Sequence, residues 1–349
     1  MMQSLSDHDV DSLASLFSAW GFKPIQAAKL LRAFYEGDGE VDWQELRLGK
    51  QLQARVEAEL PLRSSRLLTT RTSVDGTSKF LLSFDRGGAV ECVLMPAYDP
   101  TRAAGCVSSQ IGCAMGCDFC ASTKSGLERN LEAGEIVEQF LTLRRHASAG
   151  GRRLSTLVFM GMGEPMHNLE NVIAAVRRIA SPTMGNLGFR NITISTVGII
   201  PGIERLAEAD LNVHLALSLH APDDQTRSRI VPTGRKFGVV EIVAAARRFQ
   251  EQTGRIVTIE YCLLEGINDS DQQAQSLAEL LHDFRAHVNL IPYNPIGPGL
   301  SGAIYRTPSP AKISAFGAIL RARGVVAHIR RTRGDDVSAA CGQLREMMA

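Results

Sequence analysis

The 349-residue sequence lacks the features that mark a membrane or secreted protein. It contains no run of eighteen or more apolar residues, so we expect no transmembrane helix. The N-terminus, Met1 to Asp11, is polar and acidic and has no apolar core of a signal peptide. It also contains no repeat of solenoid or propeller length and no low-complexity segment. These absences indicate a cytoplasmic globular protein, long enough for one large domain and a smaller one.

The number of cysteines argues against a secreted disulfide-bonded protein, whereas the net charge excludes no class of function. The chain has seven cysteines, an odd number, and three of them lie in one loop, which does not resemble a secreted disulfide framework. The formal net charge is +1, so overall charge gives little support for nucleic-acid binding. Local charge says more, because residues 301–349 contain eight Arg or Lys against three Asp or Glu. This stretch, and basic pairs such as Arg227–Arg229, fit phosphate contacts and solvated helix faces equally well.

The loop 112–120 reads GCAMGCDFC and places three thiols at C-x-x-x-C-x-x-C spacing. Its two glycines allow a tight backbone, so Cys113, Cys117 and Cys120 are able to face one point. Thiolates are the ligands of iron–sulfur clusters and zinc. No fourth Cys or His lies nearby in sequence, which favours a 4Fe–4S cluster with one iron open to a small molecule. A zinc loop with a distant ligand and three unrelated buried cysteines are the alternatives.

The apolar period divides the chain into four parts. Residues 1–62 show the 3.6-residue period of a small helical module. Residues 63–97 change to period two, and Asp-Gly between two apolar runs predicts a β-hairpin linker with a further strand. In residues 98–333 apolar strands alternate with amphipathic helices, as in a parallel sheet covered by helices. Some six βα units fit an α/β partial (β/α)6 barrel, although an open doubly wound sheet has the same period. Residues 334–349 form a separate C-terminal segment.

Polar and glycine-rich clusters follow the predicted strands, where such a barrel places its active residues. Glycines in the first cluster would let backbone N–H groups approach a ligand's carboxylate. Each cluster alone is compatible with a simple turn or cap, but four on one rim beside the cysteine loop favour a cofactor pocket. The clusters are Gly161-Met162-Gly163-Glu164-Pro165, Ser195-Thr196, Ser218-Leu219-His220 and Asn294.

Three longer strings resemble one family. They are CVSSQIGC (106–113), FMGMGEP (159–165) and RTRGDDVSAACGQL (331–344). They look like the radical S-adenosylmethionine (SAM) RNA methyltransferases that act on C2 or C8 of adenosine, and Phe119 fills the aromatic position of the superfamily's cysteine loop. The similarity runs from about Glu91 to Leu344 and looks closer to the C2 enzymes. It implies a radical SAM partial barrel.

The resemblance also implies the cofactors and the SAM contacts. Cys113, Cys117 and Cys120 would hold a 4Fe–4S cluster, and SAM would bind at its open iron, with two SAM molecules used per turnover. The SAM contacts carried over from the family are Gly163, Glu164, Ser195, Ser218, Leu219, His220 and Asn294.

The resemblance implies roles for three further residues in transferring the methyl group and releasing the product. Cys341 would take a methyl from the first SAM, aided by a nearby positive charge that favours the thiolate. Cys106 would release the product by forming a transient disulfide with Cys341. Glu91 would be the base that removes the ring proton from the adduct. The interval from Glu91 to Cys106 is slightly longer than in the family, so Asp99 is an alternative base.

The implied substrate is RNA with its target base unstacked. The expected product is C2-methylated adenosine in 23S ribosomal RNA, at the peptidyl-transferase centre, and in tRNA, at the base 3′ of the anticodon. The helical module and basic pairs would bind the flanking RNA, a flavodoxin-type system would supply electrons, and the protein would be a monomer.

Three alternative functions stay open. They are a C8 methyltransferase that confers ribosomal antibiotic resistance, a zinc-stabilised non-catalytic RNA-binding protein, and a radical SAM enzyme that modifies protein.

Overall fold

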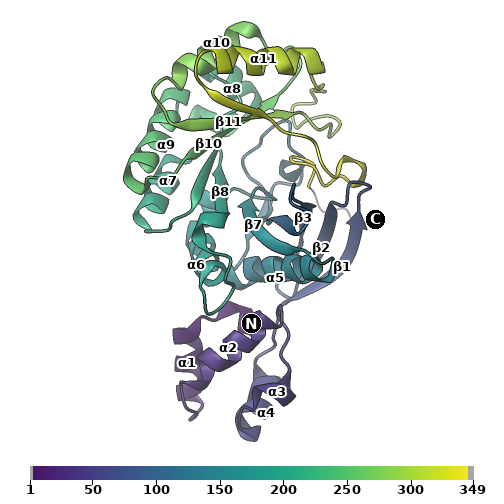
Figure 1. Cartoon of the computed structure of the whole chain (residues 1–349), viewed down its shortest axis with the longest axis vertical. Coiled ribbons are helices and arrows are strands. Elements are labelled where there is room, and N and C mark those ends of the chain that lie inside the picture. The colour runs from purple at the N-terminus through teal and green to yellow at the C-terminus, as the bar shows by residue number, and fades with distance from the viewer. Residues whose placement is uncertain (1–2, 345–349) are drawn as a thin grey trace.

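The computed structural model describes residues 3–344, and its first part is a module of short helices (Figure 1). Leu13 and Phe17 on the first helix, and Leu30, Leu31 and Phe34 on the second, are fully buried, and these two helices contact each other. The apolar period of the sequence predicts this packing. The helices are α1 (Val10–Ala19), α2 (Gln26–Glu36), α3 (Trp43–Leu46) and α4 (Lys50–Glu59).

An antiparallel strand extension follows the module. Its first turn contains Gly76 at a φ of 82°, a conformation that glycine adopts easily and that the Asp-Gly pair predicts. The third strand pairs with the first strand of the main sheet, so the extension and the main sheet are continuous. The strands are β1 (Ser65–Thr72), β2 (Ser78–Phe84) and β3 (Ala89–Pro96).

Within residues 3–344, seven parallel strands then follow one another in chain order around an open, curved sheet. This sequential order confirms the partial barrel and excludes the doubly wound alternative, in which the strand order reverses at a switch point. The first of these strands is short and contains Gly105, which explains why the apolar pattern does not reveal it. The strands are β4 (Arg102–Cys106), β7 (Arg153–Phe159), β8 (Ile192–Thr196), β9 (His214–Ser218), β10 (Val257–Leu263), β11 (Ala286–Pro292) and β12 (Val326–Ile329).

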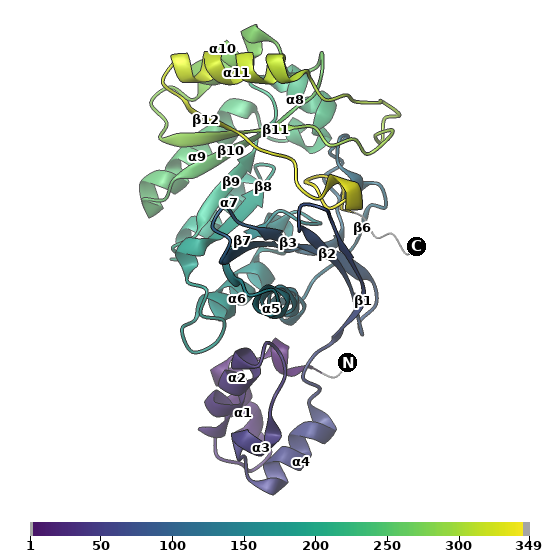
Figure 2. The same ribbon diagram turned by 45° about the vertical axis from the view of Figure 1, so that its right-hand side comes forward.

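Helices cover the outer face of this sheet and leave its inner face for the site (Figures 1 and 2). None of the helices in residues 3–344 is long and apolar enough to cross a membrane. The covering helices are α5 (Ala133–Ala149), α6 (Leu169–Ala180), α7 (Ile200–Glu208), α9 (Val239–Thr253), α10 (Asp271–Leu280) and α11 (Pro310–Ala322). The short helix α8 (Asp224–Ile230) lies instead at the carboxyl ends of the strands, where Arg227 bonds to the carbonyls of Val197 and Leu219 and Ile230 packs against the cysteine loop.

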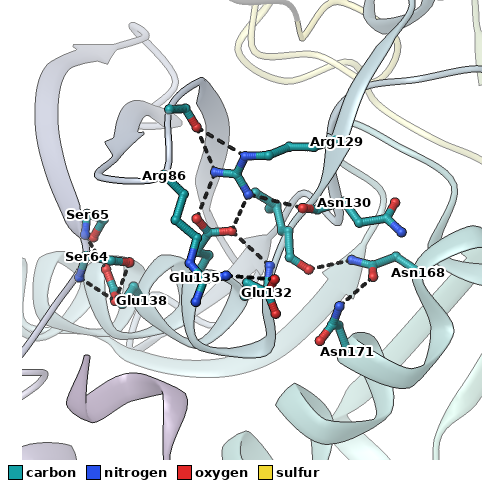
Figure 3. Close-up of polar contacts among 12 residues, drawn as sticks. Ser64, Ser65, Arg86, Arg129, Asn130, Glu132, Glu135, Glu138, Asn168 and Asn171 are labelled. Carbon is teal, nitrogen blue, oxygen red and sulfur yellow. Dashed lines mark hydrogen bonds and ion pairs between the residues drawn. The ribbon is translucent and has the colours of Figure 1, made fainter. Parts of the chain in front are cut away.

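The first half of α5 connects the module, the extension and the cysteine loop (Figure 3). Buried Glu138 accepts hydrogen bonds from the N–H groups of Ser64 (2.9 Å) and Ser65 (2.7 Å), where the chain enters β1. One turn earlier, Glu135 forms a two-oxygen ion pair with Arg129 at 2.8 Å. Arg129 belongs to β6 (Leu127–Asn130), which pairs with β5 (Gln110–Gly112) just before the cysteines. The cysteine loop therefore starts and ends on a small sheet that α5 holds in place.

Candidate active site

The three cysteines of the 112–120 loop line one cavity of about 130 Å³, which we call the first cavity. Cys113 and Cys117 are buried, and Cys120 is partly buried. The carboxyl ends of the barrel strands form the rest of the wall, as the fold predicts. The lining residues that carry chemistry are Gly163, Glu164, Ser195, Ser218, His220, Glu260 and Cys341.

The three thiols fit a cluster better than a single metal ion. Among the described residues, no three His, Cys, Asp or Glu side chains converge closely enough to hold one ion. A 4Fe–4S cluster is wider than one ion, so it takes thiolates that surround an opening. Burial raises the pKa of Cys113 to about 12 and that of Cys117 higher still, so bound iron is needed to stabilise their thiolates. This donor set therefore suits a three-cysteine cluster and does not suit a closed zinc site.

The two glycines after β7 are required by packing. A Cβ atom on Gly163 would lie 2.6 Å from the Cβ of Gln110, and one on Gly161 would lie 2.6 Å from the Oγ of Ser108. Gly163 also has a φ of 101°, which favours glycine. The end of β7 therefore packs directly against the segment that leads into the cysteine loop, a role that the sequence analysis did not assign to these glycines.

Glu164 places a buried carboxylate in the first cavity. It accepts hydrogen bonds from the N–H groups of Met166 (3.0 Å) and Val197 (2.9 Å). Burial raises the pKa of Glu164 to about 7, because desolvation outweighs these hydrogen bonds. Its carboxyl group consequently changes charge close to neutral pH.

Side chains at the ends of β8 and β9 form the opposite wall. The hydroxyl groups of Ser195 and Ser218 lie 3.3 Å apart. The Nδ1 atom of His220 accepts a hydrogen bond from the N–H of Cys262 at 3.0 Å, and its ring meets the ring of Phe119 edge-on at 4.9 Å. Burial and the charge of Arg227 lower the pKa of His220 to about 3, so the ring is neutral and has a binding role at most.

A second cavity, of about 590 Å³, opens beside the first, and Cys341 lines both. Cys106, the last residue of β4, lines the second cavity. Tyr98 lies at this cavity with 88% of its surface exposed. The remaining charged residues of the wall are all basic: Arg321, Arg330, Arg331 and Arg333.

Both cavity thiols are protonated at neutral pH. Loss of hydration raises the pKa of Cys341 to about 11, although the residue retains surface facing the cavities and Arg330 lowers its pKa. The same effect raises the pKa of Cys106 to about 12. The expected aid from neighbouring arginines is therefore present for Cys341, but desolvation exceeds it.

Two of the predicted SAM contacts lie elsewhere. Leu219 is fully buried in the main core and lines neither cavity. Asn294 lines the second cavity, where its Nδ2 atom donates to the carbonyl of Cys341 at 3.1 Å. Asn294 therefore holds the backbone of Cys341 in this structure.

The segment that carries Cys341 crosses the mouth of the barrel and reaches the tip of the β1–β2 hairpin (Figures 1 and 2). At its far end it also bonds to the residues after the cysteine loop, where the N–H of Ala121 donates to the carbonyl of Gly342 at 2.7 Å. Its residues 345–349 lie outside the described part of the chain. Three hydrogen bonds join it to the hairpin: Gly334 N–H to Asp75 (3.1 Å), Val74 N–H to Asp336 (3.2 Å) and Lys79 Nζ to the carbonyl of Ser338 (3.1 Å).

Glu91 lies next to this contact. Its buried carboxylate forms an ion pair with Lys79 at 2.8 Å, the same ammonium group that bonds to Ser338. Glu91 is on the same face of β3 as Val93, which lines the second cavity, but Glu91 does not itself line either cavity. Asp99 is exposed and hydrogen-bonds to Thr101.

Sequence reasoning missed two buried residues that shape the site. Arg227, considered above as a phosphate contact, is 1% exposed, and its Nε atom donates to the carbonyl of Leu219 at 3.0 Å. Neither a phosphate contact nor a solvated helix face, the two possibilities left open for the Arg227–Arg229 pair, holds for Arg227, because its side chain points from α8 into the protein. Asn268 is fully buried and its amide joins the carbonyls of His220 and Cys262, both at 2.7 Å. No local pattern marks either residue, because the polar stretches around Arg227 and Asn268 look like exposed loops.

Comparisons with known proteins agree with this geometry. The radical SAM superfamily model matches residues 107–278. The chain is 52% identical to a protein from Opitutus terrae named probable dual-specificity RNA methyltransferase RlmN 1, over 99% of this chain and 97% of that one. The chain belongs to the RlmN family of dual-specificity RNA methyltransferases. A second relative, from Rhodopirellula baltica, is named probable dual-specificity RNA methyltransferase RlmN and is 43% identical over 98% of this chain and 90% of its own.

A solved structure extends the likeness to the whole fold. It is a radical SAM methyltransferase from Sphaerobacter thermophilus, 43% identical, with a TM-score of 0.92 over 98% of this chain and 99% of that one. Membership of the family confirms the resemblance drawn from the three sequence strings. This chain is a radical SAM RNA methyltransferase that uses a 4Fe–4S cluster and two SAM molecules per turnover.

Proposed function

We propose that the protein methylates C2 of an adenosine in 23S ribosomal RNA and in tRNA through a methyl relay on Cys341. One observation supports this most directly: Cys341 lines both cavities. SAM bound beside the three loop cysteines would contact the sulfur from one side, and a base in the second cavity would contact it from the other. A thiol shared in this way is what a two-step transfer requires.

A relay through Cys341 is needed because adenine C2 does not react with SAM directly. C2 of adenine is an electron-poor, non-acidic ring carbon, so it does not attack the electrophilic methyl group of SAM. Cys341 does so first, as a sulfur nucleophile. When bound, the 4Fe–4S cluster supplies the electron for radical chemistry on a second SAM. Cys106, across the second cavity, is placed to attack the sulfur of Cys341 and free the product, which leaves a Cys106–Cys341 disulfide for later reduction.

The second cavity suits one base that has been flipped out of the RNA stack. Its basic wall matches phosphate groups, and exposed Tyr98 offers a stacking surface at the cavity. Enzymes that modify a base ring take the base out of its stack, and a cavity of this size accepts one. We infer that Gly163, Glu164, Ser195, Ser218 and His220 contact SAM, as the first cavity holds them all.

We also propose a base for the ring proton, an electron donor and an oligomeric state. The base that removes the ring proton is Glu91, once a shift of its Lys79 partner or of the segment opens a path to the second cavity. The electron donor is a flavodoxin-type system, and the protein acts as a cytoplasmic monomer. The backbone contact from Asn294 to Cys341 contributes to positioning the sulfur.

Nucleoside mass spectrometry after reaction with defined rRNA and tRNA fragments tests the function. We expect 2-methyladenosine in both RNAs. The Cys106→Ala variant should form a covalent RNA–protein adduct through Cys341, because nothing then releases the product. Appearance of 8-methyladenosine without 2-methyladenosine would overturn the C2 assignment, and RNA-free Cys106→Ala protein would overturn the resolving role of Cys106.

A further inference from the structure

Glu260, in β10, is a buried carboxylate with one oxygen left unpaired. Its side chain lines the first cavity, and the residue is 3% exposed. Its Oε1 atom accepts a hydrogen bond from Nδ2 of Asn289 at 2.9 Å, whereas Oε2 has no hydrogen-bond partner among the described residues. Buried polar atoms are nearly always paired, so an unpaired oxygen in a cavity wall is available to a ligand or a reacting group that enters the cavity.

The groups around Glu260 identify Cys341 as that partner. Neighbouring strands contribute uncharged side chains, Ser218 from β9 and Asn289 from β11. The charged and titratable groups that face it are Arg330, which follows β12, and Cys341 from the C-terminal segment. Cys341 lines the same cavity as Glu260, and the two interact electrostatically.

The methyl relay needs a proton acceptor at this place. Burial keeps the thiol of Cys341 protonated at neutral pH, yet the sulfur attacks SAM as a thiolate. Burial also raises the pKa of Glu260, which makes its carboxylate a stronger base than an exposed one. The charge of Arg330 and the hydrogen bond from Asn289 oppose this rise in the pKa of Glu260 without removing it.

Other titratable groups line the same cavity: Glu164, His220, Cys262 and Cys120, the last of which also interacts electrostatically with Cys341. We propose that Glu260 is the general base for methylation of Cys341, with Oε2 taking the thiol proton. The S–H bond breaks and its proton moves to Oε2, while a sulfur electron pair bonds to the methyl carbon of SAM. The bond between that methyl carbon and the sulfonium breaks, and S-adenosylhomocysteine leaves with the electron pair. The carboxylate and the sulfonium both become neutral, so charge balances and no oxidant or reductant is needed. Asn289 is a positioning residue that fixes Oε1.

The inference rests on the proposed function, and it is tested on the first half-reaction alone. Protein prepared without iron, so that Cys341 starts unmethylated, is reconstituted anaerobically and mixed with SAM carrying a deuterated methyl group, without RNA or reductant. The rate of Cys341 methylation is followed by peptide mass spectrometry from pH 6 to 10. For Glu260→Gln, which keeps the size and the Asn289 bond, we expect a loss of roughly 100-fold at pH 7 that narrows as rising pH ionises the thiol.

Controls separate this role from others. Glu265→Gln removes an exposed carboxylate just beyond β10 and should leave the profile unchanged. Glu260→Asp keeps a carboxylate farther from the sulfur and should react more slowly with a wild-type pH profile; it serves as the second test if Glu260→Gln does not hold a cluster. A Glu260→Gln profile parallel to wild type, with weaker SAM binding, would show that Glu260 only binds SAM and would overturn the proposal.

Two failures are distinguishable. If wild-type protein methylates Cys341 and the Glu260 variants do so equally fast at every pH, the general-base role is overturned while the relay stands. If wild-type protein never methylates Cys341 under these conditions, the relay itself is overturned, and the role of Glu260 with it.

Discussion

The cysteine loop and the C-terminal segment both bring sulfur to this site, but they are built in opposite ways. The three loop cysteines lie within 113–120, and short-range bonds shape their backbone, such as the one from Cys120 N–H to the carbonyl of Cys117 at 3.1 Å. The segment has little regular structure and is held by groups far away along the chain. Val74 and Asp336, for example, are 262 positions apart. Local sequence therefore brings the three loop cysteines together, although distant groups such as Ser301 also bond to the loop through Asp118, whereas Cys341 is placed mainly by tertiary contacts.

This difference makes the two regions separable in experiments. A change in the loop should remove the cluster and everything that depends on it. A change in the segment should leave the cluster and SAM binding intact and affect only transfer to RNA. Three predictions test this separation, and the largest expected effect comes first.

Removing one sulfur from each region should give two different losses. Cys113→Ala takes away a cluster ligand, so we expect loss of iron, of reductive SAM cleavage and of RNA methylation. Cys341→Ala should keep the iron content and continue to form 5′-deoxyadenosine while producing no methylated RNA. Iron analysis, chromatography of 5′-deoxyadenosine and nucleoside mass spectrometry measure the three outcomes.

Cys92→Ala is the matched control for these two variants. Cys92 is fully buried and lines neither cavity, so its variant should retain iron and activity. If Cys341→Ala lost its cluster, the two regions would form one cooperative unit and the separation proposed above would be wrong.

The SAM side of the site should respond to pH through Glu164. Because burial raises its pKa to about 7, the carboxylate forms as pH rises through 7 and is mostly protonated below it. If the contact that we infer between Glu164 and SAM is to the positively charged amino group, SAM affinity should fall by up to about tenfold per pH unit below 7. Glu164→Gln should bind SAM roughly 10- to 100-fold more weakly and lose this pH dependence, as expected for a hydrogen bond to a charged group.

Calorimetry on cluster-loaded protein between pH 6 and 8.5 measures this affinity. Glu170→Gln, an exposed change on α6, controls for the loss of one negative charge. A wild-type affinity that stays constant across this range would contradict the assignment of Glu164.

The smallest effect is expected where the hairpin holds the segment. Asp75→Ala together with Asp336→Ala removes the acceptors for Gly334 N–H and Val74 N–H. Each hydrogen bond contributes about 0.5–1.5 kcal/mol, so Cys341 should spend less time in place and RNA methylation should slow by roughly three- to tenfold. Iron content and SAM cleavage should not change.

Asp85→Ala provides the comparison within the same strand extension, because its exposed ion pair with Arg66 lies in a different turn. That variant should methylate RNA at the wild-type rate. Equal rates for the double variant and wild type would show that the bonds near the cysteine loop hold the segment without help from the hairpin.

Sequence reasoning reached the parts of the site that local patterns encode. The apolar period predicted a parallel sheet covered by helices, the Asp-Gly pair predicted the hairpin, and the strings around Cys106, Gly163 and Cys341 indicated the family and, through it, the partial barrel. It did not reach Glu260, because a polar residue in an apolar strand looks the same whether it faces a cavity or a neighbouring carbonyl. It did not reach Arg227 or Asn268 either, because a polar residue in a polar stretch looks like an exposed one. It also treated the hairpin as a linker, although its tip bonds to the segment that carries Cys341.

The sequence by itself determined the spacing of the loop cysteines, the alternation of strands and helices, and the hairpin turn at Asp75-Gly76. These features depend on backbone angles and contacts between near neighbours, which a short window of residues specifies. Only the tertiary structure decided that Cys341 lies between two cavities, that Glu260 faces one of them with a free oxygen, and that Lys79 joins Glu91 to the C-terminal segment. Those arrangements need groups from opposite ends of the chain to meet, and they exist only once the whole barrel has closed around its core.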